Sequence, residues 1–325
     1  KVELEINLTL DNLKAVPLVL VNKFTAMPFD TQFLLESKLQ QIAGRLNDTL
    51  KKAVSHSQTI VDLEKIIALT GLDRSIDRRQ FQTSKSLYTK ELFYNYSQQI
   101  KPAFMASNGI IKKVLVLDCD NTLWSGVLGE DGENNLEMSD LSTRGKSFSE
   151  VQYLIKSFEK KGVLLALCSK NNSEDVDQIL KNHPDMILKN HNFVAKKVNW
   201  IDKAKNLIEI SHELNLGLDS FVFVDDSEFE LGLIKTALPE VKTVMVPKDI
   251  SEYPTIIRNL ESDFFSFSST HEDTSKTLMY KHERTRAEAS KAFGSIDDYL
   301  ASLGLCIKIY LDKNIKIHHL GGSSH

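Results

Sequence analysis

The sequence has 325 residues, of which 42% are hydrophobic and 26% are charged, close to the average for globular proteins. Its 40 basic and 44 acidic residues give a net charge of −4 without a basic block, which argues against a dedicated nucleic-acid-binding protein. No apolar run reaches the roughly 20 residues of a membrane span, so we expect no integral membrane protein.

The first hundred residues predict a small α/β unit. Residues 16–21 and 59–63 have the apolar character of buried strands. Between them, apolar residues recur every three or four positions from Phe33 to Leu50, which predicts a long amphipathic helix. This block contains no matched nucleophile and base, because its single histidine, His56, has no serine in a tight turn to accompany it.

A second α/β series follows the turn at Asn108-Gly109. We expect strands at 110–117, 163–168, 221–224 and 241–246. We expect helices at 148–161, 201–214 and 229–237, and one more helix that begins after an N-cap at Ser173. Strands that are apolar on both faces and alternate with helices indicate a parallel sheet covered on both sides. Ligands in such sheets bind at the carboxyl ends of the strands.

The pattern changes beyond about residue 262, where a charged helix at 272–293, a short helix at 296–303 and a strand at 305–310 are predicted. We therefore divide the chain into four segments: an α/β domain at 1–108, a core at 109–262, a truncated helical and β extension at 263–312, and a tail or tag remnant at 313–325.

Three of the apolar strands end in polar side chains that could share one site. The first ends in Asp118 and Asp120, the second in Ser169, and the third in Asp225-Asp226. Lys203 lies at the start of the helix before that third strand. A DxDxT pattern alone is weak, and acids at strand ends also serve as caps and turn formers. The conjunction of all these residues predicts a functional site.

These residue types suit phosphoryl transfer, which needs an in-line nucleophile and neutralisation of the phosphoryl oxygens. A carboxylate can be that nucleophile and form an aspartyl-phosphate, while a second carboxylate protonates the leaving group and then activates water. Mg²⁺ prefers oxygen ligands and keeps several waters, so two or three acids suffice to hold it. A serine hydroxyl and a lysine ammonium can then bind the phosphate oxygens.

The constellation resembles all four motifs of the haloacid dehalogenase (HAD) superfamily, and the stretch 114–132 (VLVLDCDNTLWSGVLGEDG) resembles its FkbH-like branch, subfamily IIIC. Further stretches similar to this branch are 167–172, 183–186, Asn199-Trp200 with Lys203, and 216–226. The resemblance is strong over about residues 110–250. Residues 45–100 look like the end of the SGNH-hydrolase-like domain that precedes the phosphatase in this branch. The resemblance implies an α/β fold with a Rossmann-like HAD core and a minimal cap. A smaller SGNH-like domain, partial and catalytically degenerate, would precede this core in the chain.

The resemblance assigns the roles. Asp118 would be the nucleophile and a Mg²⁺ ligand, and Asp120 the general acid and base, ligating through its backbone carbonyl. Ser169 and Lys203 would bind phosphate, and Asp225 and Asp226 would complete the metal site, without a decision on which coordinates directly. Asn171 and Cys119 are further substrate-binding candidates. Residues 124–144 are too few for a large cap, so an open site is expected.

Two alternatives to the phosphatase remain. Cys119, between the catalytic acids, could accept an acyl group from an acyl phosphate on the way to a carrier protein, although an extended strand would point it away from Asp118 and Asp120. The chain could also be a non-catalytic partner-binding module. Trp124 and Trp200 are lid or packing residues, with packing favoured. Residues 77–80 lack the histidine of an active SGNH hydrolase.

The expected partners are a phosphorylated small molecule and an acyl carrier protein, with no nucleic acid or membrane. The chain shows no signal-peptide pattern, and its three cysteines (Cys119, Cys168 and Cys306) are widely spaced and odd in number. That usage argues against a disulfide framework or a CxxC zinc site and predicts a reducing cytoplasm. A role in secondary-metabolite or polysaccharide biosynthesis would follow from the resemblance.

Overall fold

The computed structural model describes residues 1–31, 34–55 and 57–267. His56, Cys306 and the elements expected beyond residue 267 lie outside the described residues. Across the described part of the chain, no helix is both long and apolar enough to cross a membrane.

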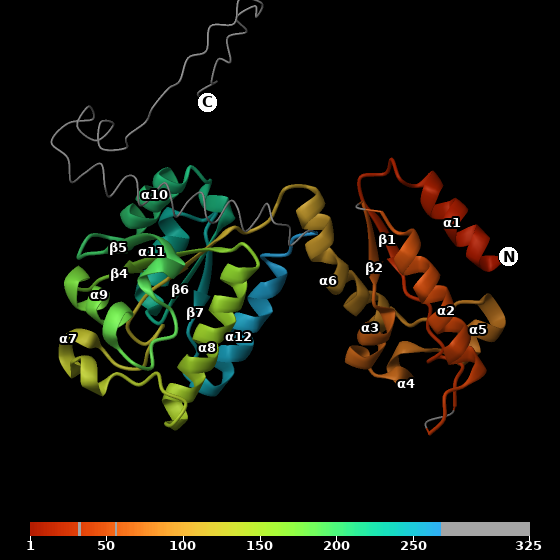
Figure 1. Ribbon diagram of the computed structural model, residues 1–325, viewed down its shortest axis with the longest axis horizontal. Coiled ribbons are helices and arrows are strands. Elements are labelled where there is room, and N and C mark those ends of the chain that lie inside the picture. The colour runs from red at the N-terminus through yellow and green to blue at the C-terminus, as the bar shows by residue number, and fades with distance from the viewer. Residues whose placement is uncertain (32–33, 56, 268–325) are drawn as a thin grey trace, which may run out of the picture.

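The N-terminal part contains a two-stranded parallel sheet with helices around it (Figure 1). Its elements are α1 (Val2–Asn12), β1 (Val19–Asn22), α2 (Lys38–Ala53), β2 (Gln58–Val61), α3 (Leu63–Thr70), α4 (Leu72–Ser75), α5 (Arg78–Ser84) and α6 (Lys90–Ser107). Both predicted strands and the helix between them are present. The helix begins later than predicted, because Ser37 and Gln40 form a capping box there. Leu39 and Ile42 of its apolar stripe are exposed, whereas Leu50 is buried.

The larger part is a five-stranded parallel sheet in the order β5-β4-β3-β6-β7. Its elements are β3 (Val114–Leu117), α7 (Leu128–Asp131), α8 (Thr143–Lys160), β4 (Leu164–Ser169), α9 (Ser173–Asn182), β5 (Phe193–Val198), α10 (Lys203–Leu214), β6 (Phe221–Asp225), α11 (Glu228–Ala237), β7 (Lys242–Met245) and α12 (Tyr253–Asn259). The chain winds from β3 outward to β5 and then returns to β6 on the other side. The topological switch point therefore lies between β3 and β6, where such sheets bind ligands.

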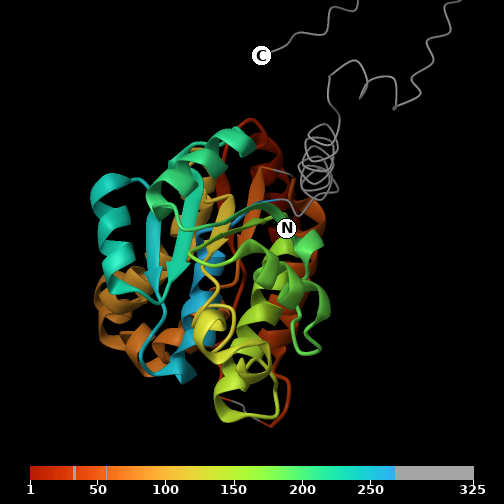
Figure 2. The same cartoon turned by 90° about the vertical axis from the view of Figure 1, so that its left-hand side faces the viewer.

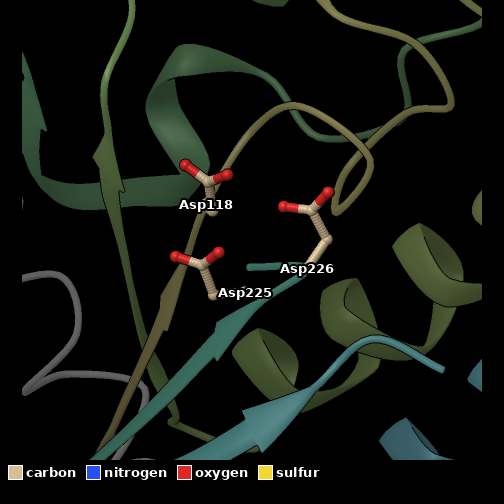
Figure 3. A group of neighbouring side chains, drawn as sticks. All are labelled: Asp118, Asp225 and Asp226. Carbon is tan, nitrogen blue, oxygen red and sulfur yellow. The ribbon is translucent and has the colours of Figure 1, made fainter. Parts of the chain in front are cut away.

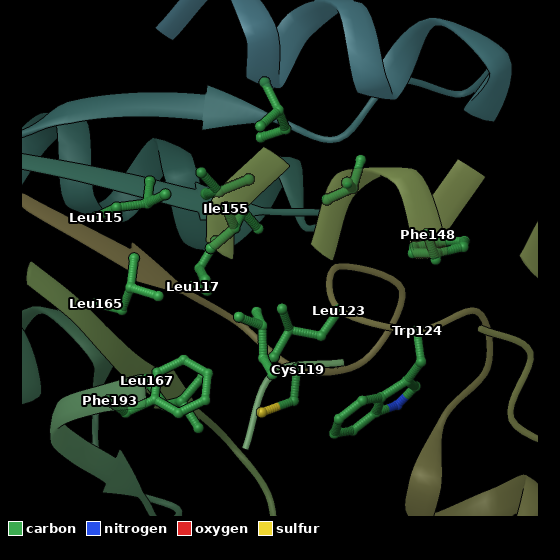
Figure 4. Close-up of a cluster of buried hydrophobic side chains, with 14 of the residues drawn as sticks. Leu115, Leu117, Cys119, Leu123, Trp124, Phe148, Ile155, Leu165, Leu167 and Phe193 are labelled. Carbon is green, nitrogen blue, oxygen red and sulfur yellow. The ribbon is translucent and has the colours of Figure 1, made fainter. Parts of the chain in front are cut away.

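Helices cover both faces of this sheet (Figure 2). Successive side chains of a strand point to opposite faces. Leu115 and Leu117 accordingly pack against α8, α9 and α12, whereas Val114 and Val116 pack against α10 and α11. Figure 4 shows the first of these two cores. The expectation of an α/β fold with a parallel sheet covered on both sides is confirmed.

The structure differs from the predicted elements in several places, among them an unpredicted helix α12 and a helix α8 that begins at Thr143. The first strand begins at Val114, because residues 110–113 form a loop. Strand β5 was not predicted; it lies at the edge of the sheet and carries Lys196 and Lys197, so it lacks the continuous apolar run of the central strands. Ser173 is not an N-cap: it is the first residue of α9, and Asn172 precedes it without a capping side-chain hydrogen bond.

Candidate active site

Three carboxylates gather at the switch point. Asp118 directly follows β3, Asp225 is the last residue of β6, and Asp226 comes next (Figure 3). One carboxylate oxygen from each lies within 4.8 Å of the others. The backbone N–H of Asp118 donates to the carbonyl of Val224 at 3.0 Å, which joins the ends of the two strands. The sheet itself therefore fixes these carboxylates.

Lys203 supplies the positive charge of the site. It is the first residue of α10, whose N-cap Asp202 accepts the backbone N–H groups of the first turn. Its Nζ lies 2.6 Å from Asp225 Oδ2 and 3.1 Å from Asp118 Oδ1, and the side chain is buried. Burial lowers the pKa of Lys203, but the charges of Asp118 and Asp225 outweigh burial and raise it above its usual value. The lysine therefore stays charged.

Asp118 is in an environment that opposes its ionisation. Burial raises the pKa of Asp118 to about 7, with Lys203 lowering it and Asp225 raising it further. Lys203 contacts Asp118 Oδ1 as an ion pair, and apart from this ammonium group that buried oxygen has no hydrogen-bond partner among the described residues. A buried carboxylate oxygen that only an ammonium group contacts among the described residues, beside two more carboxylates, fits the oxygen ligands of a hard divalent cation.

The other two acids of the cluster are held differently. Asp225 is fully buried, and its Oδ1 accepts the backbone N–H of Ser227 at 2.8 Å while Oδ2 accepts from Lys203. Asp226 is half-buried and hydrogen-bonded to the Asn121 side chain. Burial and the neighbouring Asp225 raise the pKa of Asp226. Both oxygens of Asp225 are thus engaged by protein groups.

Asp120 lies apart from that cluster. Its carboxylate is not among the three that can hold a metal, and it is partly exposed. Trp124 Nε1 and the backbone N–H of Leu128 donate to its Oδ1 at 3.0 and 3.1 Å, and Asn171 Nδ2 donates to its Oδ2 at 2.9 Å. The two acids of the DxDxT pattern therefore have different surroundings, as an acid/base residue beside a nucleophile would need.

Ser169 and Asn171 reach the same edge from the end of β4. Ser169 is buried, and its hydroxyl hydrogen-bonds Asp118 and accepts from Asn171 Nδ2 at 3.3 Å. The structure brings Asp118, Ser169, Lys203, Asp225 and Asp226 together, with Asp120 joined to them through Asn171. We predicted Asn171 as a substrate-binding residue; in the structure its amide contacts the side chains of Ser169 and Asp120.

The Cys119 side chain lies in the apolar core and contacts one residue of the site, Ser169. Its thiol is fully buried in the apolar core beside Leu123 and Trp124 (Figure 4). Burial raises the pKa of the Cys119 thiol well above its usual range. A nucleophilic cysteine needs an exposed thiol with a lowered pKa, so the surroundings of Cys119 are those of an inert core residue.

The two tryptophans have opposite environments. Trp124 is fully buried and packs in the core, as favoured by the sequence interpretation. Trp200 is 75% exposed, so the packing role favoured for it is wrong. Its loop is fixed by hydrogen bonds between the Asn199 and Asn206 side chains and by the backbone N–H of Asn199, which donates to the Ser169 carbonyl at 3.0 Å.

Two residues at the site were missed as polar partners. The Trp124 indole N–H bonds Asp120 four positions earlier, and the Tyr253 hydroxyl of α12 donates to the Thr122 carbonyl at 3.1 Å. A buried tryptophan near a carboxylate could have signalled the first contact, because a buried indole N–H needs an acceptor. Tyr253 is 131 residues from Thr122, and no local pattern connects them.

The comparisons with known proteins point to the same fold. No family model and no curated protein matches the chain. Among solved structures, it is similar to the N-terminal part of the protein BF1531 from Bacteroides fragilis, which contains a phosphatase domain and was crystallised in complex with Mg. The sequences are 26% identical, the match covers 82% of this chain and 75% of the other, and the TM-score is 0.65. The chain thus shares its fold with a phosphatase-containing protein and carries an acidic cluster that fits a divalent cation.

Proposed function

We propose that the chain is a Mg²⁺-dependent phosphohydrolase or phosphotransferase that acts through an aspartyl-phosphate on Asp118. The observation that carries this proposal is the cluster of Asp118, Asp225 and Asp226 around Lys203, with a buried Asp118 oxygen that, among the described residues, only the Lys203 ammonium contacts. The similarity to a protein with a Mg-bound phosphatase domain supports the same activity. The four motifs support membership of the HAD superfamily, in its FkbH-like branch.

In the proposed reaction, a carboxylate oxygen of Asp118 attacks the phosphorus, and the bond from phosphorus to the leaving-group oxygen breaks. Asp120 gives its proton to that oxygen. Water then attacks the phosphoryl group while Asp120 takes back a proton, and the bond from phosphorus to Asp118 breaks to release phosphate. Ser169 and Lys203 bind the phosphoryl oxygens, which suits an ammonium group 3.1 Å from Asp118.

Mg²⁺ would be held by Asp118, Asp225 and Asp226, with the Asp120 carbonyl as a further ligand, and would neutralise charge on the phosphoryl oxygens. The expected substrates are phosphorylated small molecules. A glyceryl-type acyl phosphate used in loading a carrier protein, within secondary-metabolite or polysaccharide biosynthesis, follows from the FkbH-like resemblance. The resemblance also supports a degenerate SGNH-like N-terminal domain.

The experiment is Mg²⁺-dependent phosphate release from a panel of phosphate esters and acyl phosphates, with and without chelator. Release that chelator abolishes is expected, and the ranking of the panel indicates the substrate class. Absence of release from every member would overturn the phosphatase proposal. A protein that also fails to bind Mg²⁺ would instead be a partner-binding module.

We expect Mg²⁺ affinity to fall as the pH falls below about 7. Before a cation binds, burial raises the pKa of Asp118 to about 7, so below that pH the carboxyl is mostly neutral and a proton competes with the cation. Each further pH unit should weaken binding by about tenfold. Calorimetric titration on either side of pH 7, in two buffers of different ionisation enthalpy, measures both the affinity and the protons released. Affinity that does not change with pH would contradict this role of Asp118.

Cys119→Ala is expected to leave phosphate release unchanged. Because the thiol is fully buried in the core, its loss should cost only about 1–2 kcal/mol of the free energy of unfolding. Phosphate release and urea denaturation measure the two effects. A variant that stays folded but loses turnover would favour acyl transfer through Cys119, which further predicts a thioester that thiol-blocking reagents abolish.

A further inference from the structure

The hydrogen bonds of Asp120 distinguish its two carboxylate oxygens. Oδ1 accepts from both Trp124 Nε1 and the backbone N–H of Leu128, whereas Oδ2 accepts from Asn171 Nδ2 within the described part of the chain. A carboxylate oxygen offers about two lone pairs. Oδ1 is therefore saturated, and Oδ2 keeps a lone pair that can take up and release a proton.

Trp124 cannot easily turn away from this contact. Its side chain is fully buried, and the chain between it and Asp120 forms a tight turn in which the Cys119 carbonyl accepts the N–H groups of Thr122 and Leu123 at 3.2 and 2.8 Å. Beyond it, Gly126 has φ +111°, and a Cβ there would lie only 3.0 Å from the Asp131 carboxylate. The turn thus fixes the direction of the indole N–H.

Asn171 holds Asp120 from the opposite side. It follows β4, is buried, and its Nδ2 lies 2.9 Å from Asp120 Oδ2 and 3.3 Å from Ser169 Oγ. The amide has two N–H donors, so it can bond both groups at once. It therefore sets the position of the Asp120 oxygen relative to the serine that contacts Asp118.

We propose that Trp124 and Asn171 are positioning residues that orient Asp120 so that its Oδ2 transfers the proton. The proposal rests on the proposed function, in which Asp120 is the general acid and base. The uncharged N–H donors of Trp124 and Asn171 orient the carboxylate and do not supply the transferred proton themselves. Proton transfer at Oδ2 gives the proton to the leaving-group oxygen in the first step and recovers one from water in the second.

The test compares substrates whose leaving groups differ in their need for a proton. Trp124→Phe removes the indole N–H but keeps an aromatic ring in the core. The quantity measured is kcat/KM, because it reports the steps up to the first irreversible one, phosphorylation of Asp118. For glycerol phosphate, whose alkoxide must be protonated, we expect a fall of about 10- to 100-fold, the loss typical of a hydrogen bond to a charged group. For p-nitrophenyl phosphate, whose leaving group is stable as an anion, we expect a much smaller fall.

Two further variants separate positioning from packing. Asn171→Ala removes the donor on the other side of Asp120 without touching the core around Trp124. Like Trp124→Phe, it should lower kcat/KM more for glycerol phosphate than for p-nitrophenyl phosphate. Phe148→Leu loosens the same apolar cluster but has no polar contact with Asp120, so it should affect both substrates equally. If Trp124→Phe destabilises the protein too far to assay, Asn171→Ala decides alone.

The outcomes distinguish this proposal from the proposed function. Leaving-group discrimination by Trp124→Phe or Asn171→Ala supports it. The positioning role is overturned if the native enzyme is active and both variants, Trp124→Phe and Asn171→Ala, lower kcat/KM equally for the two substrates or for neither. The proposed function then stays intact. A native protein that releases no phosphate from either substrate or from any member of the wider panel overturns both.

Discussion

Asp118→Asn is expected to lower Mg²⁺-dependent phosphate release by about a thousandfold or more, the scale on which loss of a catalytic nucleophile acts. Asparagine has nearly the same shape as aspartate but cannot form an acyl phosphate. The fold should survive, because Lys203 keeps its 2.6 Å contact with Asp225 and one buried carboxyl that resists ionisation is removed.

Asp185→Asn is the matched control, since this aspartate is exposed and lies outside the acidic cluster. It should retain full phosphate release. Circular dichroism and urea denaturation establish that both variants are folded. A folded Asp118→Asn variant with near-native turnover would contradict the nucleophilic role of Asp118.

Lys203→Met should have the largest effect on stability. It leaves the carboxylates of Asp118 and Asp225 buried without their positive partner, and breaking a buried charge pair in this way costs about 3–5 kcal/mol of the free energy of unfolding. Mg²⁺ should restore part of the loss, because the cation would replace the missing positive charge. Turnover should not return with it, since the phosphoryl oxygens still lack the ammonium group.

Urea denaturation with and without Mg²⁺ measures this effect. Lys205→Met, two residues further along α10 and exposed, serves as the control and should change the free energy of unfolding little. A loss below about 1 kcal/mol for Lys203→Met would show that Lys203 does not compensate buried charges.

The central strands and the residues that follow them could be predicted because both signals are local. β3, β4 and β6 are buried along their whole length, so each reads as a continuous apolar run that ends at a polar residue. The parallel sheet then brings Asp118, Ser169 and Asp225 to one edge. The strand order and the side-by-side position of β3 and β6 had to come from the structure.

The remaining features depend on tertiary contacts. β5 was missed because its edge position tolerates lysines that obscure the strand pattern. The hydrogen bond from Asn171 to Asp120 joins residues 51 positions apart in the sequence. The exposure of Trp200 depends on which other segments of the chain pack against its loop. The exposed Leu39 and Ile42 of α2 show, in the same way, that an amphipathic pattern predicts a helix better than it predicts what covers the apolar face.

The most direct test of the account is to trap the enzyme during turnover. The native protein is mixed with Mg²⁺ and p-nitrophenyl phosphate, quenched in acid, digested and examined by mass spectrometry. We predict one added phosphoryl group on the peptide that contains Asp118, removable by hydroxylamine as expected for an acyl phosphate and missing from Asp118→Asn. Turnover without any phosphorylated peptide, or with the phosphoryl group on another residue, would contradict the aspartyl-phosphate mechanism.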